Sequence, residues 1–316
     1  MINKKILIIG GTGALGRTLV RRYQDTNSVM VLSRDEHKQV NMRNMDWTND
    51  SVRYKIGDVK DPDSLRNAIE ECKPQVIINA AAIKHVPVCE DNPFESVNVN
   101  IIGHQNLIQQ VERSKHQIET LIFVSTDKAC KPINVYGMSK AIAERLYIEY
   151  AKKTTRKVCI VRYGNVLEST GSVIPFFKNL LAADETFLPI TDFKMTRFLL
   201  TLDRATDLIE WAYNEMTSHG CIAIPKVQSF SIVDIANALI RSTGKHVELR
   251  EVGVRPGEKL HEEMISEEEW MRSIEFNDNF LITDEVIRNE RNSYNSSVTT
   301  NSKDVYKFLQ DSGVIE

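Results

Sequence analysis

The sequence is poor in cysteine and lacks any long apolar run. Its 316 residues include five cysteines, an odd number, and no two of them stand in Cys-x-x-Cys spacing. This scatter argues against a zinc site or a disulfide framework and predicts reduced, buried thiols in a cytoplasmic protein. No apolar stretch approaches the roughly 20 residues that cross a bilayer. The apolar run after Lys5 is also too short for the core of a signal peptide.

The chain also lacks an excess of charge of either sign. Forty basic residues stand against 43 acidic ones, for a net charge of −3. Such a balance gives no reason to expect nucleic acid or an anionic membrane as a partner. We therefore expect neither partner, and we expect no bound metal.

Short β-branched runs alternate with helical patterns through the first half of the chain. Buried strands are predicted at 4–10, 28–33, 51–57, 75–80, 119–125 and 157–164, and helices at 14–24, 62–72, 94–114 and 137–153. This alternation predicts an α/β fold with a doubly wound parallel sheet of Rossmann type. The chain is long enough for one such domain and a smaller region beside it.

The first predicted strand runs directly into GGTGALG. Gly10, Gly13 and Gly16 stand there in G-x-x-G-x-x-G spacing, with Thr12, Ala14 and Leu15 between them. Glycines at this place allow a tight turn and a close approach to a pyrophosphate. The free N–H groups at the start of the following helix then face the phosphates. The stretch therefore predicts a dinucleotide site, with a plain tight turn as the alternative.

The end of the second strand bears on which dinucleotide binds. An NAD enzyme usually offers an acidic residue there, about 20 residues after the glycines, for the ribose 2′-hydroxyl. Here the strand ends in Ser33-Arg34, a hydroxyl and a guanidinium that suit a 2′-phosphate. Asp35 and Glu36 follow at once and leave NAD open as the alternative. We favour NADP, and we include Lys38 among its expected contacts.

Two further strand ends should line the cofactor. Asp58 and Val59, after the third strand, would lie near the adenine, although Asp58 could instead, or in addition, cap the helix at 62–72. After the fourth strand, Ala80, Ala81 and Ala82 would let the cofactor pass closely. We therefore predict a dinucleotide-binding domain over 1–165, completed by part of 198–226.

The stretch STDKACKPINVYGMSK carries Tyr136 and Lys140 in Y-x-x-x-K spacing. On a helix these residues lie one turn apart on one face. The ammonium, together with a positive nicotinamide, should lower the pKa of the phenol from about 10. The phenol could then take the proton of a substrate hydroxyl as hydride leaves for the cofactor.

The order of motifs resembles a known superfamily. GGTGALG, GDVKD, NAAAIKHV, FVSTDKACKPINVYGMSK, RYGNV, PITDFKMTRF and VGVRPGEKLHEEM are similar to blocks of the extended short-chain dehydrogenases/reductases over residues 4–265. Within that superfamily the chain resembles the soluble, inverting UDP-N-acetylglucosamine 4,6-dehydratases of pseudaminic acid-type pathways. The resemblance implies UDP-N-acetylglucosamine as substrate, NADP that is regenerated in each cycle, and a homo-oligomer, either a hexamer or a dimer.

The resemblance also gives a role to the pair that precedes the tyrosine. A 4,6-dehydratase oxidises C4, removes water across C5 and C6, and returns the hydride to C6. By this match Thr126 holds the 4-oxygen, Asp127 is the acid for the departing 6-hydroxyl, and Lys128 is the base at C5. A base must be neutral, so we expect burial and nearby cations to depress the pKa of Lys128. The alternative is an exposed Asp–Lys pair at a strand end.

The substrate-binding region is expected over 166–197 and 227–316. Residues implied by the family match are Lys84 (for cofactor or sugar), Asn165, Val173, Thr191, Arg197, Arg255 and Glu258. Arg255 is our choice for the diphosphate, because a guanidinium meets phosphate oxygens in a fork. Glu168 and Thr170 replace a glycine and an arginine of the usual family pattern. We interpret the polar tail at 289–304 as a solvated loop or a pinned segment, and we favour the loop.

Three other functions stay open at this point. A retaining 4,6-dehydratase would carry Asp-Glu where this chain has Asp127-Lys128, and a C4-epimerase would need Tyr136 and Lys140 but not that pair. A non-catalytic NADP sensor would typically have lost the tyrosine or the lysine. The inverting reaction predicts the product UDP-2-acetamido-2,6-dideoxy-β-L-arabino-hexos-4-ulose.

Overall fold

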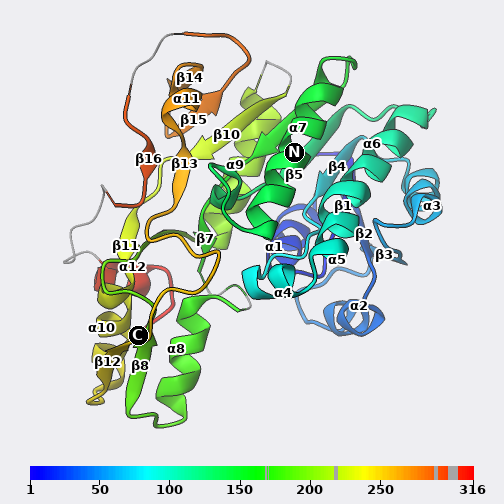
Figure 1. Cartoon of the computed structure of the whole chain (residues 1–316). Coiled ribbons are helices and arrows are strands. Elements are labelled where there is room, and N and C mark those ends of the chain that lie inside the picture. The colour runs from blue at the N-terminus through cyan, green and yellow to red at the C-terminus, as the bar shows by residue number, and fades with distance from the viewer. Residues whose placement is uncertain (168, 170, 217–219, 288–290, 298–304) are drawn as a thin grey trace.

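A computed structural model gives the fold of the chain and describes all residues except 168, 170, 217–219, 288–290 and 298–304. In this part a nine-stranded sheet has the order β14-β15-β10-β6-β5-β4-β1-β2-β3 (Figure 1). Its parallel strands are β1 (Lys5–Ile9), β2 (Ser28–Ser33), β3 (Arg53–Ile56), β4 (Val76–Asn79), β5 (Thr120–Val124), β6 (Lys157–Val161) and β10 (Cys221–Pro225). The predicted doubly wound parallel sheet is confirmed.

Both faces of this sheet are covered by helices. In β1, Leu7 and Ile9 face one core, and Ile6 and Ile8 face the other, as alternate residues of a strand must. The first core is closed by α3 (Pro62–Cys72), α6 (Gly103–Arg113) and α7 (Val135–Ala151). The second is closed by α1 (Ala14–Tyr23), α2 (Glu36–Arg43) and α9 (Leu202–Glu215). Burial on both faces explains why the strands read as continuous apolar runs.

The helix predicted at 94–114 contains a π-helical turn. α5 (Pro93–Val97), which follows α4 (Val86–Asp91), leads into the turn η1 (Asn98–Ile102) and then into α6. The wider turn carries the buried Asn100, whose amide bonds both backbone groups of Ile83 at 2.9 Å and the Ser139 hydroxyl at 3.0 Å. One side chain thus ties the loop after β4 to α7, which fits the frequent occurrence of π-bulges at functional sites.

The C-terminal part contributes to the large sheet as well as to the second lobe. β14 (Ser273–Phe276) and β15 (Asn279–Ile282) form an antiparallel hairpin that pairs with β10. This hairpin lies within 227–316, the range predicted for the substrate region, and it extends the large sheet. Ile282 and Phe280 join the first core, so burial of their side chains holds the hairpin on the sheet edge.

The smaller lobe has a core of its own. It contains α8 (Val173–Ala182), α10 (Ile232–Thr243), α12 (Val305–Asp311) and the parallel pair β8 (Phe187–Ile190) and β12 (Glu248–Glu251), which lie together at the lower left of Figure 1. Between the lobe and the large sheet runs the three-stranded sheet β11-β9-β7, made of Ser229–Ser231, Thr196–Leu200 and Asn165–Val166. These strands carry the chain between the two layers.

The described part of the polar tail is pinned and is not a solvated loop. β16 (Tyr294–Asn295) pairs with β13 (Glu263–Ile265). The Tyr294 hydroxyl accepts from the N–H of Val227 at 2.9 Å and donates to its carbonyl at 2.8 Å. Ser296 is fully buried. Our preference for the loop was wrong here, because contacts with distant segments outweigh the polar composition.

Candidate active site

The glycine turn after β1 lies in close contact with the segment that follows β4. Gly10 has φ of 78°, and a Cβ on it would lie 2.8 Å from the backbone nitrogen of Ala81, so neither its conformation nor its space admits another residue. A Cβ on Gly16 would lie 2.4 Å from the Cα of Gly11. Helix α1 starts at Ala14 behind Gly13, whose position carries no side-chain cap. The first N–H groups of α1 are thus left for an anion, as a dinucleotide pyrophosphate requires.

Arg34 directly follows β2, Lys38 lies in α2, and both side chains are exposed. Asp35 caps α2 by accepting from the N–H of Lys38 at 3.0 Å, and its carboxylate pairs with the Lys38 ammonium at 3.1 Å. The buried Ser33 hydroxyl accepts from the Gln39 amide at 3.0 Å. The acidic residue that could have served a ribose hydroxyl is therefore engaged with its own helix.

Asp58 and Val59 lie at the end of β3. Asp58 accepts from the N–H of Lys60 at 2.9 Å, whereas Asp61 is the residue that caps α3. The alternative that Asp58 caps this helix is therefore wrong. Val59 is buried against Gly103, where a Cβ would meet its side chain at 2.6 Å. Ala80, Ala81 and Ala82 follow β4 and are partly exposed beside the glycine turn.

The loop after β5 packs directly on the helix that carries the tyrosine. The short 3₁₀ turn η2 (Asp127–Ala129) precedes α7, whose N-cap Asn134 accepts from the N–H of Gly137 at 2.7 Å. The amide of Asn134 also donates to the carbonyl of Gly257 at 2.7 Å. One capping residue therefore joins the catalytic stretch to the distant RPGEK loop.

Asp127 and Lys128 form a buried pair, not an exposed one. Asp127 is fully buried, and its Oδ1 accepts from the Thr126 hydroxyl at 3.0 Å and from Lys128 Nζ at 3.2 Å. Lys128 Nζ also donates to Asn165 Oδ1 at 3.3 Å. Its third partner is Glu262, whose Oε1 lies 3.2 Å away. The exposed-pair alternative is thereby excluded.

The charges around Lys128 reverse one of our expectations. Burial alone would lower the pKa of Lys128, but the carboxylates of Asp127 and Glu262 outweigh it and raise that pKa well above its ordinary value. The expected depression of the pKa is therefore wrong. The pKa of Asp127 is raised by burial and by Glu262, against the opposing charge of Lys128. The pKa of Glu262 is lowered, because Lys128 and Arg197 overcome its burial.

The pKa of Tyr136 also differs from our expectation, and burial changes that of Lys140 as well. Burial raises the pKa of Tyr136 to about 12, and the partial lowering comes from Lys128 and the Thr126 hydroxyl. Burial lowers the pKa of Lys140 to about 7. Lys140 Nζ donates to the carbonyl of Val124 at 2.6 Å and lies 4.1 Å from the centre of the Phe123 ring. The chain alone therefore does not produce the lowered phenol pKa, and Lys128 is the nearby cation that acts on it.

Two of the residues expected to bind substrate, Asn165 and Arg197, lie beside Lys128 and Glu262. Asn165 in β7 contacts Lys128, and the buried Arg197 in β9 lies 3.9 Å from Glu262 and donates to the carbonyl of Thr196 at 2.7 Å. Val173 starts α8, Thr191 follows β8, and Lys84 is exposed after β4. Arg255 is exposed in its loop. Glu258 has one carboxylate oxygen buried without a hydrogen-bond partner among the described residues. Glu168 and Thr170 lie outside those residues.

Two features near the site escaped sequence reasoning. Glu262 stands in a run of acidic residues, and the sequence does not indicate which of them is buried beside Lys128. Arg162, 1% exposed, bonds both carboxylate oxygens of Glu144 and of Glu269 at 2.6–3.0 Å and the carbonyl of Met264 at 2.8 Å. Ser125 donates to Glu144 at 2.6 Å. This buried cluster joins the loop after β5 to the segment that carries Glu262.

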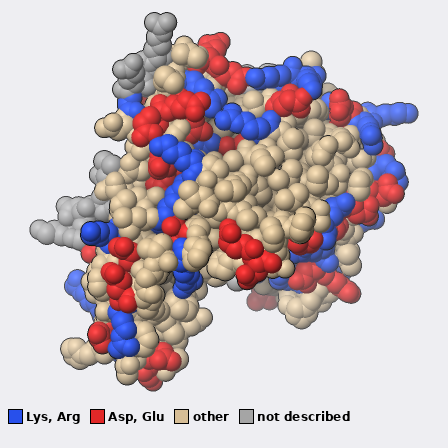
Figure 2. Space-filling view, in the orientation of Figure 1, with Lys and Arg blue, Asp and Glu red and all other residues tan. Residues whose placement is uncertain are grey.

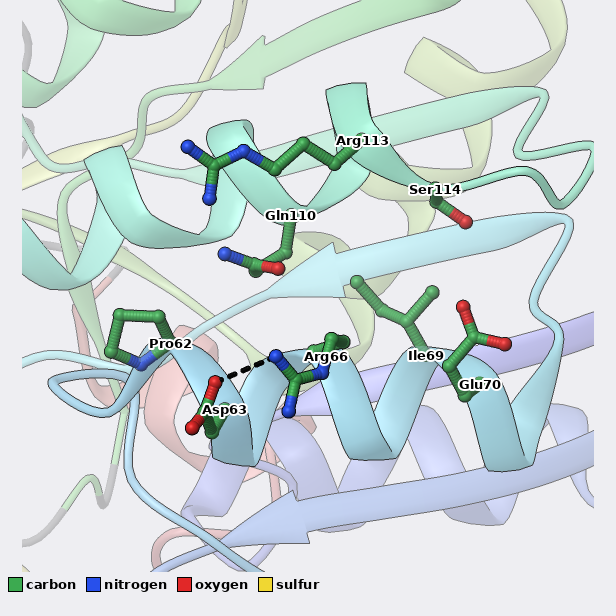
Figure 3. Close-up of a pocket in the computed structure, with 8 residues that line it drawn as sticks. All are labelled: Pro62, Asp63, Arg66, Ile69, Glu70, Gln110, Arg113 and Ser114. Atoms are coloured by element: carbon green, nitrogen blue, oxygen red, sulfur yellow. Dashed lines mark ion pairs between the residues drawn. The ribbon is translucent and has the colours of Figure 1, made fainter.

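A hollow elsewhere on the molecule does not belong to this site. A cavity of about 210 Å³ lies between α3 and α6. Figure 3 shows the side chains that line it, among them the ion pair of Asp63 and Arg66, whose charged atoms are 2.8 Å apart. Its lining residues are Pro62, Asp63, Arg66, Ile69, Glu70, Gln110, Arg113 and Ser114. None of the expected site residues is among them. The expected residues that follow β1 to β5 lie instead at the carboxyl ends of the parallel strands, where ligands bind in doubly wound sheets.

The comparisons with known proteins agree with this geometry. The family model described as polysaccharide biosynthesis protein matches residues 6–284. The chain belongs to this family. The UDP-N-acetylglucosamine 4,6-dehydratase (inverting) of Campylobacter jejuni is 39% identical over 89% of this chain and 83% of that relative. The UDP-glucose 4-epimerase of Rickettsia bellii is 37% identical over 86% and 80%.

Solved structures confirm the fold of this family member. The X-ray structure of Pen from Bacillus thuringiensis superposes with a TM-score of 0.90 and 31% identity, over 99% of both chains. The described residues contain no group of three or more His, Cys, Asp or Glu side chains that could hold a metal ion. All five cysteines are buried, and no disulfide joins them. No helix in the described ranges has the length and apolar character to span a bilayer.

Proposed function

We propose that the protein is a nucleotide-sugar 4,6-dehydratase that acts on UDP-N-acetylglucosamine and inverts C5. The buried Asp127–Lys128 pair carries this proposal, because it lies on the loop that packs against the Tyr136 helix. An acid and an amine at the same place as an alcohol-oxidising tyrosine fit a reaction that oxidises C4 and then removes water across C5 and C6. The inverting relative in Campylobacter jejuni supports the assignment of substrate and stereochemistry.

Tyr136, Thr126, Asp127 and Lys128 each have one task in this proposal. Tyr136 takes the proton of the 4-hydroxyl, and Thr126 orients the 4-oxygen. Asp127 gives a proton to the departing 6-oxygen, for which its raised pKa is suited. Lys128 takes the C5 proton. Arg255 and Glu258 bind the nucleotide, and Lys84, Val173 and Thr191 line the site of the nucleotide sugar.

We further propose NADP as the dinucleotide. When bound, NADP accepts a hydride and gives it back. The glycine turn and the uncapped start of α1 would hold its pyrophosphate. Arg34 and Lys38 would face a 2′-phosphate, and Asp35 is already engaged in capping α2. This engagement supports NADP over NAD.

A C4-epimerase is the second candidate, because the Rickettsia bellii relative carries that name. An epimerase needs Tyr136 and Lys140 but has no step for a buried acid and amine. The full burial of Asp127 argues against it, since an unused buried carboxyl costs stability. An epimerase would return a product of unchanged mass.

The deciding experiment offers several nucleotide sugars to the purified protein without added cofactor. Mass spectrometry should detect the loss of one water from UDP-N-acetylglucosamine. Turnover without loss of mass, with a changed C4 configuration in the NMR spectrum, would replace the dehydratase by the epimerase. Absence of turnover of every sugar in the presence of NADP would contradict both functions.

The stereochemistry needs its own measurement. In heavy water the reaction should place deuterium at C5, and ring couplings should report the L-arabino arrangement of UDP-2-acetamido-2,6-dideoxy-β-L-arabino-hexos-4-ulose. Lys128→Ala should stop exchange at C5 while cofactor reduction stays measurable. A product with the D-xylo arrangement from the earliest time point would show a retaining enzyme.

A homo-oligomer, either a hexamer or a dimer, also belongs to the proposal. Figure 2 shows a broad face with few charged side chains over α5 to α7. Phe94 on α5 is 86% exposed, and Met138 and Ile142 on α7 are 48% and 47% exposed. Exposed apolar side chains gathered on packed helices are typical of an interface. Light scattering at several concentrations should give a mass above that of one chain.

A further inference from the structure

Glu262 is a third ionisable group in the cluster, and the function proposed above gives it no task. Its side chain is 3% exposed, and its Oε1 lies 3.2 Å from Lys128 Nζ, the same distance as Asp127 Oδ1 on the other side. Its Oε2 is buried and has no hydrogen-bond partner among the described residues. A carboxylate oxygen in that state is costly unless the site uses it.

The backbone of Glu262 is held in place from the polar tail. The N–H of Glu262 donates to Ser296 Oγ at 2.9 Å, and the N–H of Ser296 donates to the carbonyl of Glu262 at 2.8 Å. Ser296 Oγ is in turn 2.7 Å from Thr196 Oγ1 in β9. A position pinned on both sides aims the carboxylate at Lys128 and does not leave it free to turn toward solvent.

The charged groups around Glu262 come from three segments. Asp127 and Lys128 lie on η2, Arg197 lies on β9 with its Nε 3.9 Å from Glu262, and Lys259 acts from the RPGEK loop. The pKa values of the two carboxyls move in opposite directions: burial and the charge of Glu262 raise that of Asp127, whereas Lys128, Arg197 and Lys259 lower that of Glu262 against its burial. Two carboxyls with divergent pKa values are typical of an acid and a proton acceptor that work together. Asp127 is thus suited to hold a proton, whereas Glu262 is ionised and lies 3.2 Å from the Lys128 ammonium with no proton of its own.

We propose that Glu262 accepts the proton that Lys128 must release before it can act at C5, and that it positions the amine for this step. The inference rests on the proposed dehydratase function. It supplies a route from the ammonium, which contacts the carboxyl group of Asp127 and the carboxylate of Glu262, to a neutral base. Glu262 acts through Lys128 and is therefore a positioning and proton-accepting residue.

Every proton and electron pair is accounted for in the proton transfer and the loss of water. An N–H bond of Lys128 breaks and an O–H bond forms at Glu262, which turns the ion pair into a neutral amine and a carboxylic acid. The amine then takes the C5 proton of the 4-keto sugar, and the electron pair of that bond moves between C5 and C6. The C6–O bond breaks as the oxygen takes the proton of Asp127, and water leaves. The proton on Glu262 can return to Asp127 by way of Lys128, which contacts both carboxyls.

The test compares Glu262→Gln with Glu263→Gln. The neighbouring glutamate faces Lys131 at 3.0 Å and so gives the same chemical change outside the cluster. Stopped-flow absorbance of the reduced cofactor measures oxidation at C4, and mass spectrometry with deuterium incorporation measures dehydration and exchange at C5. Glu262→Gln should keep oxidation within a few-fold of wild type and slow dehydration by about 10²–10⁴-fold at neutral pH. Glu263→Gln should match wild type in both.

The pH profile separates a proton acceptor from a merely structural group. Without Glu262, Lys128 must lose its proton to solvent, so dehydration by Glu262→Gln should rise with pH toward the pKa of Lys128. Dehydration by Glu262→Asp, which keeps a carboxylate, should depend less on pH. Equal loss of both half-reactions at every pH would assign Glu262 a structural role only. Dehydration as fast as or faster than wild type would also overturn the inference.

The same experiment distinguishes a failure of this inference from a failure of the proposed function. If wild type fails to dehydrate UDP-N-acetylglucosamine, the function itself is wrong. If wild type dehydrates it and Glu262→Gln does so equally well, only the role of Glu262 is wrong. Should Glu262→Gln fail to fold, the rate and pH profile of Glu262→Asp against Glu263→Gln still decide, because loss of the flat profile in Glu262→Asp contradicts the acceptor role.

Discussion

Gly137 in α7 lies so close to Lys128 that a Cβ on it would stand 2.2 Å from the Lys128 carbonyl oxygen. This contact lets the tyrosine helix approach the turn that carries Asp127 and Lys128. The obstacle is backbone, which cannot rotate away as a side chain could. The close approach of the Tyr136 helix to the Asp127–Lys128 turn thus depends on the absence of one methyl group.

Gly137→Ala should therefore separate the two halves of the site. Either η2 or α7 must shift, and misplacement by about 1 Å can cost on the order of 10²-fold in rate. We expect kcat to fall by about that factor, measured with UDP-N-acetylglucosamine at saturation. Gly313→Ala is the control, because no atom lies within 4 Å of its added Cβ and only backbone strain at φ of 69° arises. Full activity of Gly137→Ala would show that the close approach is not needed.

Tyr136→Phe and Asp127→Asn should fail at different points of the reaction. Without the phenol no proton leaves the 4-hydroxyl, so neither reduced cofactor nor dehydrated product should form. Asp127→Asn removes the acid of the second half, which should slow dehydration by about 10²–10⁴-fold while reduced cofactor accumulates. Absorbance of the reduced cofactor and mass spectrometry of the sugar measure the two halves. Unimpaired dehydration by Asp127→Asn would remove Asp127 from the mechanism.

Arg34→Asp should reverse the preference for the dinucleotide. Arg34 is exposed at the end of β2, where an aspartate would repel a 2′-phosphate and could accept from a ribose hydroxyl. Calorimetry should show weaker binding of NADP and unchanged or tighter binding of NAD. Lys115→Asp, in the exposed segment that precedes β5, makes the same change of charge as a control. A wild-type protein that binds NAD more tightly than NADP would contradict the assignment.

The buried cluster of Arg162 and Glu269 should make stability depend on acid pH. The pKa of Glu269 is lowered to about 2, because Arg162 and hydrogen bonds overcome its burial. A lowered folded-state pKa gives stability that is present above the unfolded value and is lost as pH falls toward the folded one. Between about pH 4.5 and 2 this group alone should reduce the free energy of unfolding by up to about 1.4 kcal/mol per pH unit.

Glu269→Gln tests that dependence by urea denaturation at several pH values. At pH 7 the variant should be less stable by about 3–5 kcal/mol, because one partner of a buried pair is gone. The difference from wild type should shrink as pH falls through the stated window. Glu267→Gln, whose side chain is 56% exposed, should follow wild type. A constant difference at all pH values would show that Glu269 titrates as it does in the unfolded chain.

Much of the nucleotide-binding half could be read from the sequence. The strands, the turn at Gly10–Gly16 and the start of the Tyr136 helix are specified by neighbours along the chain. Apolar runs, glycines and the capping Asn134 act within a few residues of one another. Such local signals do not need the rest of the fold, which is why the parallel sheet and its strand ends were predicted.

Tertiary structure alone decided the charge of the site and the place of the C-terminal segments. The sequence predicts a lowered pKa for Lys128. In the fold, Glu262, which is distant in the sequence, lies beside Lys128 and helps to raise that pKa. The hairpin of β14 and β15 and the pinned Tyr294 follow from burial against β10 and Val227. In a buried site the strength of a charge depends on what folding brings within a few ångströms, because water no longer screens it. Local sequence patterns determined which groups are present, and the long-range contacts of the fold determined their protonation.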